Sequence, residues 1–129
     1  MTDKLRRVVL VVEQDKFLKS LTADIMEDAG FATLQASDAD EAVAILASRS
    51  DIALLLTSVT MPGSMDGLGL AYMVRQRWPA IRIIITSSKV WLTANNFPIG
   101  SRFVPKPYRA QVMISEIRSL VGPQAEPAS

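Results

Sequence analysis

The chain contains neither cysteine nor histidine. Without cysteine it can form no disulfide, use no thiol nucleophile and build no cysteine-rich zinc site. Without histidine it lacks the commonest metal ligand, the usual general base near pH 7 and any phosphohistidine of its own. These two absences exclude thiol catalysis, histidine catalysis and the metal sites built from either residue.

The chain also lacks an excess of either positive or negative charge. The chain of 129 residues has 14 Lys and Arg against 13 Asp and Glu, which leaves a net charge of +1. A charge this small supplies no field that steers a protein toward nucleic acid or an anionic membrane, so we expect neither as a partner. The apolar run 8–12 ends at Glu13 and is too short for a signal peptide or a membrane span. We therefore expect a cytoplasmic protein.

With 49% hydrophobic and 6% aromatic residues, the composition is that of one folded globular domain. Strands are predicted at 8–12, 31–36, 52–56, 81–85 and 103–104, because apolar and β-branched residues form short runs there. Helices are predicted from about 15 to 29, from Ser37 or Asp38 to about 49, from Asp66 to the residue before Pro79, and from 110 to 121. This alternation predicts a parallel sheet with helices on both faces, within a domain at 1–121 that is followed by a flexible tail at 122–129.

The segment 88–101, which connects the last two predicted strands, departs from this alternation of strands and helices. It contains Asn95, Asn96, Pro98 and Gly100, so the fourth helix of the pattern is predicted to be short or absent. Its apolar residues are predicted to pack as core, the alternative being a partly exposed contact patch. They are Val90, Trp91, Leu92, Phe97, Pro98 and Ile99.

Polar residues follow the predicted strands at their carboxyl ends, where open α/β sheets bind ligands. They are Glu13, Gln14 and Asp15 after the first strand, Ser58 after the third, Thr86 after the fourth, and Lys106 with Pro107 after the fifth. A flavin or dinucleotide site needs a glycine- or hydroxyl-rich phosphate cradle after the first strand. The acidic residues found there argue against such a site, although a flavodoxin-like domain that binds a small molecule or nucleotide stays as an alternative.

From about residue 7 to residue 121 the sequence resembles the receiver domain of two-component response regulators. The resemblance rests on four segments in the right order and spacing: VVLVVEQD, LLLTSVTMPGSMDGLGLA, IIITSS and FVPKPY. It implies the flavodoxin-like (βα)5 receiver fold, with a five-stranded parallel sheet of order 2-1-3-4-5. It also implies a non-enzymatic module of phosphorelay signalling. Such a module binds a protein partner, namely a signalling kinase, a regulator, an output protein or a second copy of itself.

The resemblance assigns roles to individual residues, and two assignments are unusual. Glu13 and Gln14 occupy the places where the family has a pair of magnesium-holding acids. Ser58 occupies the place of the aspartate that accepts the phosphoryl group. The other places are filled as the family fills them: Thr86 as the hydroxyl that senses the phosphoryl group, Lys106 as the lysine that pairs with it, Phe103 as the aromatic switch residue, and Pro107 after a cis peptide bond.

Charge counting shows what these two differences imply. A typical receiver pocket has more carboxylates than lysines, whereas the charges of Glu13 and Lys106 cancel, so we expect no magnesium and no other cofactor. Ser58 cannot form an acyl phosphate, and the chain offers no evident base to activate its hydroxyl. We therefore expect a phosphorylation-independent interaction module, in which Lys106 and Glu13 form a neutral cluster with the hydroxyls of Ser58 and Thr86. The alternative is a conventional phosphoacceptor that uses another residue, such as Asp15.

Overall fold

The computed structural model describes residues 7–63, 65–88 and 97–122. Its five parallel strands form one sheet in the order β2-β1-β3-β4-β5, which confirms the predicted fold class and strand order. The strands are β1 (Val8–Val12), β2 (Ala32–Ala36), β3 (Ile52–Ser58), β4 (Arg82–Ser87) and β5 (Arg102–Pro105). The helices in the described ranges are α2 (Lys16–Asp28), α3 (Ala39–Ser48), α4 (Gly67–Arg77) and α5 (Ala110–Val121).

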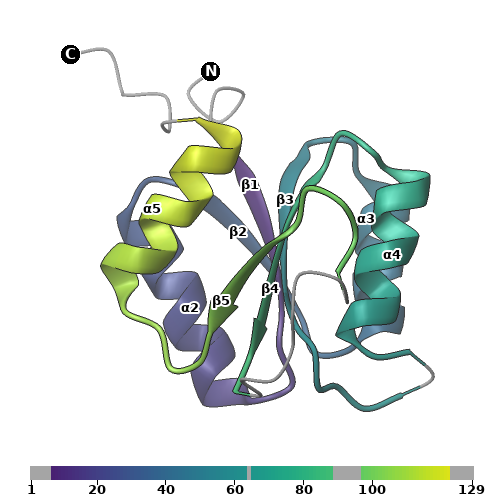
Figure 1. Ribbon diagram of the computed structural model, residues 1–129, viewed down its shortest axis with the longest axis horizontal. Coiled ribbons are helices and arrows are strands. Elements are labelled where there is room, and N and C mark those ends of the chain that lie inside the picture. The colour runs from purple at the N-terminus through teal and green to yellow at the C-terminus, as the bar shows by residue number, and fades with distance from the viewer. Residues whose placement is uncertain (1–6, 64, 89–96, 123–129) are drawn as a thin grey trace.

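The helices cover both faces of the sheet, with α2 and α5 on one face and α3 and α4 on the other (Figure 1). Successive residues of β1 therefore enter different cores. Val9 and Val11 pack toward α2 and α5, whereas Leu10 and Val12 pack toward α3 and α4. A strand covered on both faces must be apolar at every position, which explains the uninterrupted run in the sequence.

The first three helices begin in the same way, with an aspartate whose side chain accepts a backbone N–H from the first turn. Such a cap satisfies one of the donors that a helix leaves free at its start. The three pairs are Asp15 with the N–H of Leu18, Asp38 with that of Glu41, and Asp66 with that of Gly69.

Strands β3 and β4 continue beyond their predicted ends, to Ser58 and Ser87. Parallel pairing persists through these polar residues, with Ser58 opposite Thr86, and both are buried. The prediction stopped too early because it took the last apolar residue as the strand end. Ser58 and Thr86 are therefore positioned by the sheet itself, and not by the loops that follow it.

The segment between β4 and β5 is described only at Ser88 and 97–101, and these residues form no helix. Phe97 and Pro98 are buried, as predicted. Ile99 is 94% exposed, so the prediction of a core position is wrong for this residue. The reason is a turn, closed by a hydrogen bond from the N–H of Ser101 to the carbonyl of Pro98, that directs Ile99 outward. The predictions for Val90, Trp91 and Leu92, and for a fourth helix that is short or absent, fall mostly on residues that the structure does not describe. Of the flexible tail predicted at 122–129, only Gly122 is described.

Candidate functional site

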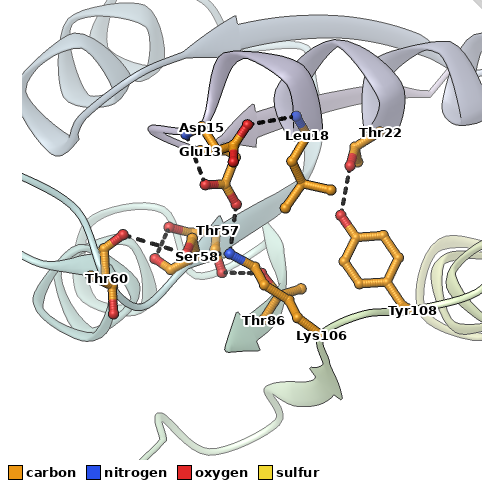
Figure 2. Close-up of polar contacts among 10 residues, drawn as sticks. All are labelled: Glu13, Asp15, Leu18, Thr22, Thr57, Ser58, Thr60, Thr86, Lys106 and Tyr108. Atoms are coloured by element: carbon orange, nitrogen blue, oxygen red, sulfur yellow. Dashed lines mark hydrogen bonds and ion pairs between the residues drawn. The ribbon is translucent and has the colours of Figure 1, made fainter. Parts of the chain in front are cut away.

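Three polar side chains from separate strands meet at the carboxyl edge of the sheet (Figure 2). Lys106 Nζ donates a hydrogen bond to Glu13 Oε1 at 2.8 Å and another to Ser58 Oγ at 2.9 Å. Glu13 directly follows β1, Ser58 ends β3 and Lys106 directly follows β5. We call Glu13, Ser58 and Lys106 the polar cluster.

Glu13 is the buried charge of the polar cluster. Its side chain is 7% exposed, whereas that of Lys106 is 19% exposed. Oε1 of Glu13 pairs with Lys106 Nζ, and Oε2 accepts the backbone N–H of Asp15 at 3.0 Å. A carboxylate removed from water requires such partners, because an unpaired buried charge is strongly destabilising. Both oxygens of Glu13 are thus occupied by donors from the chain itself.

Ser58 is held in the polar cluster by two hydrogen bonds of its hydroxyl. Its Oγ accepts the hydrogen bond from Lys106 and donates one to the carbonyl of Thr60 at 3.5 Å, and the residue is only 2% exposed. A serine hydroxyl becomes a nucleophile when a neighbouring base removes its proton. Lys106 Nζ acts as a donor in both of its contacts and therefore supplies no such base.

Thr86 and Phe103 do not belong to the polar cluster in the described structure. The hydroxyl of Thr86 donates to the backbone carbonyl of Thr57 at 3.5 Å, since the sheet register places Thr86 beside Ser58. Phe103 is half-buried and stacks on Phe97, with the ring centroids 5.4 Å apart. The expected four-membered cluster is therefore formed by three side chains, and Thr86 satisfies its hydroxyl elsewhere.

Gln14, Asp15 and Pro107 all lie on the exposed rim of this edge. The Asp15 carboxylate is turned toward α2, where it caps Leu18 as described above (Figure 2). Of the three polar residues that follow β1, Glu13 alone is buried. The peptide bond between Lys106 and Pro107 is cis, as the resemblance implied.

Tyr108 is a site residue that the sequence reasoning missed. Its hydroxyl lies 2.6 Å from Thr22 Oγ1, and this contact joins the segment after β5 to α2 (Figure 2). Burial raises the pKa of Tyr108, the hydrogen bond with Thr22 lowers it, and the negative charge of Glu13 raises it further; the net direction is upward. The only available signal was its position two residues after Lys106 in the FVPKPY segment.

This pKa shift predicts how stability responds to alkaline pH. The raised pKa means that the fold favours the protonated phenol of Tyr108 more than the unfolded chain does, whose value is near 10.0. The resulting stability is present below pH 10 and is lost as the pH rises through the raised pKa. Urea unfolding at a series of pH values from about 9 upward should show a shallower loss for Tyr108→Phe than for the wild type. Equal slopes would contradict the assignment.

Within the described ranges, no group of three or more His, Cys, Asp or Glu is placed to hold a metal ion. None of the described helices is long and apolar enough to cross a membrane.

Comparison with known proteins identifies the family of the chain. Residues 9–118 match the family model of the response regulator receiver domain. The chain is 27% identical over 109 residues to a putative NtrX-like response regulator of Rickettsia bellii, an alignment that covers 82% of this chain and 23% of that protein. It is 31% identical over 106 residues to the DNA-binding transcriptional regulator NtrC of Salmonella typhimurium, covering 80% and 22% of the two chains. The chain thus spans less than a quarter of the length of these relatives.

Solved structures give the same result. The receiver domain of NtrX from Brucella abortus superimposes with a TM-score of 0.80 at 26% identity, covering 88% of this chain and 97% of that one. A CheY-like receiver domain from Methanospirillum hungatei, at 21% identity and a TM-score of 0.81, shares the fold and covers 92% and 96% of the two chains. The family model spans most of the chain, and the strand order agrees with the fold of these receiver domains. The chain therefore belongs to the response regulator receiver domain family.

Proposed function

We propose that this receiver domain is a phosphorylation-independent interaction module in two-component signalling, in which Ser58 stands where the family has its phosphoacceptor aspartate. The observation that carries the proposal is the double contact of Lys106 with Ser58 and Glu13, at 2.9 and 2.8 Å. The lysine that would pair with a phosphoryl group is already engaged by the chain itself. The proposal makes the domain non-enzymatic, as receiver domains typically are.

Ser58 is unsuited to the role of a phosphoacceptor. An acyl phosphate requires a carboxylate, and an alcohol requires a base, which the polar cluster does not contain. Asp15 is no better placed, because its carboxylate caps α2 and points away from β3 (Figure 2). The conventional phosphoacceptor alternative therefore finds no support in the geometry.

The residues of the polar cluster do not fit the magnesium ion that the family binds. Magnesium prefers carboxylate and phosphate oxygens and retains several waters. Both oxygens of Glu13 are already bonded to donors, the charges of Glu13 and Lys106 cancel, and Gln14 is exposed and uncharged. We therefore propose that the domain works without a metal or cofactor, and the flavin or nucleotide alternative likewise finds no phosphate cradle after β1.

The contacts of Lys106 with Glu13 and Ser58 fix the end of β5 relative to β1 and β3. Receiver domains of response regulators interact with kinases and output domains, and this one presents such a partner with a single permanent arrangement. We propose that this partner is a protein in the cytoplasm, and the nearly neutral charge of +1 argues against nucleic acid as a partner.

A phosphorylation assay with a restored variant tests the proposal. The wild type, incubated with acetyl phosphate and magnesium, should gain no adduct of about 80 Da in intact-mass spectrometry. It should also show no thermal shift with beryllofluoride and magnesium. The matched control is the double variant Gln14→Asp/Ser58→Asp, which makes the pocket net negative and should respond to beryllofluoride. A stable phosphoryl adduct on the wild type would overturn the proposal.

A further inference from the structure

Strand β2 is an outer strand of the sheet and pairs only with β1. The N–H of Ala32 and the carbonyl of Ala36 form hydrogen bonds with the chain segment that contains β1. Because the backbone groups of successive strand residues point to opposite sides, those of Thr33, Gln35 and Ser37 point away from β1. We call this side the free edge of β2. Backbone groups in such a row are a template to which another strand can add.

Two glutamate side chains bind backbone donors of the free edge. Oε2 of Glu27, near the end of α2, accepts the N–H of Thr33 at 3.1 Å and the hydroxyl of the same residue at 2.8 Å. Oε1 of Glu41, in the first turn of α3, accepts the N–H of Ser37 at 2.7 Å. We infer that Glu27 and Glu41 block the free edge of β2 against the addition of another strand.

The two bound donors are the ones that a pairing between two copies would need. If two β2 edges pair antiparallel with Gln35 opposite Gln35, Thr33 of one copy lies opposite Ser37 of the other. Such a pairing uses the N–H groups of all three residues. With those of Thr33 and Ser37 bound to glutamates, each copy contributes the N–H of Gln35 alone. One hydrogen bond from each copy does not offset the freedom that two molecules lose when they associate.

Helix capping explains the position of Glu41 but not that of Glu27. Asp38, the N-cap of α3, accepts the N–H of Glu41, while the Glu41 side chain turns back to the N–H of Ser37. This arrangement resembles a capping box, in which two side chains satisfy donors at the start of one helix. Glu27 belongs to another helix and binds Thr33, a residue of β2. Blocking the free edge is therefore the role that the two glutamates share.

The opposite edge of the sheet, at β5, is protected by a different residue. The N–H of Lys106 donates to the carbonyl of Ser87, so Phe103 and Pro105 point away from β4. Proline has no N–H, and β5 is only 4 residues long. The sheet thus resists strand addition at both edges, and a protein partner has to bind through helices and loops. This inference goes beyond the proposed function and does not depend on it, because it uses no residue of the polar cluster.

Amide hydrogen exchange of the wild type, followed by NMR, tests the two hydrogen bonds. After correction for intrinsic rates, Thr33 and Ser37 should exchange at least about tenfold more slowly than Gln35, because their N–H groups are bound. Glu27→Ala should accelerate exchange at Thr33 and not at Ser37, and Glu41→Ala should do the reverse. Equal exchange of the three amides in the wild type would refute the inference.

Sedimentation of the full chain over a concentration series tests the consequence of opening the edge. Glu27→Ala/Glu41→Ala should associate at least about tenfold more tightly than the wild type, because its edge donors are available to a second copy. The amide of Gln35 should become protected from exchange in the associated form. A double variant that associates no more tightly than the wild type, or that associates without protecting Gln35, would show that the glutamates do not block the edge.

Two further double variants separate the hydrogen bonds from the loss of charge. Asp24→Ala/Asp40→Ala removes the same charge from the same two helices at exposed positions and should associate like the wild type. Glu27→Gln/Glu41→Gln keeps an acceptor oxygen at both sites and should also associate like the wild type. Circular dichroism checks that each variant is folded. Tighter association of either variant would assign the effect to charge, and the inference would fail.

Discussion

Replacing Gly67 with alanine is expected to lower the free energy of unfolding by about 3 kcal/mol or more. A Cβ atom at Gly67 would lie 1.7 Å from the carbonyl oxygen of Ser58 and 2.9 Å from the Cα of Val59. These are backbone atoms at the end of β3, and the N–H of Gly67 donates to the carbonyl of Val59 at 2.8 Å. The clash is relieved only if the start of α4 moves away from the strand that carries Ser58.

The matched control is the same substitution at Gly69, in the same helix. A Cβ at Gly69 meets the Cγ of Met65 at 2.7 Å, and this flexible side chain can move aside. Alanine is also the better helix former, by about 1 kcal/mol. Urea denaturation should therefore show a large loss for Gly67→Ala and a small change for Gly69→Ala. Similar losses of unfolding free energy for both variants would mean that the close approach of Gly67 to Ser58 does not determine the position of the start of α4.

The second large effect is expected at Lys106. Lys106→Met removes the only side-chain cation that contacts Glu13 in the described structure and leaves the carboxylate buried without its charge partner. Breaking one side of such a pair typically costs about 3–5 kcal/mol. Thermal and urea unfolding should show a loss of this size.

A double-mutant cycle identifies the cause of that loss. Glu13→Gln removes the buried charge, so the double variant Glu13→Gln/Lys106→Met should recover much of the stability that Lys106→Met loses. Arg82→Ala, at an exposed cation on β4, controls for the general effect of removing a positive charge. If Lys106→Met costs no more than Arg82→Ala, the polar cluster does not hold the fold together.

Much of the sheet could be predicted because strands that are buried on both faces are apolar at successive positions in the sequence. The run 8–12 is apolar at every position, and its residues enter the two cores alternately. The meeting of Glu13, Ser58 and Lys106 was also predictable. Parallel strands bring their carboxyl ends to one edge of a sheet, so residues far apart in the chain are placed together there.

The local details could not be predicted, because tertiary contacts decide them. Ser58 belongs to β3 because the pairing with β4 outweighs the polar character of its side chain. Thr86 satisfies its hydroxyl on a neighbouring backbone carbonyl, and the exposure of Ile99 follows from a turn. Tyr108 and Thr22 are 86 residues apart in the sequence, and no local pattern around either residue predicts their contact.

The ion pair between Glu13 and Lys106 also has a consequence for folding during synthesis. Its partners are separated by 93 residues, so during synthesis Glu13, after β1, cannot pair with Lys106 until β5 has also left the ribosome. Contacts of such long range form late and slow the folding of a domain. A nascent chain that stops before Lys106 therefore carries a carboxylate with no cation to accompany it into the interior. The segment after β5 thus determines when the buried carboxylate after β1 gains its charge partner.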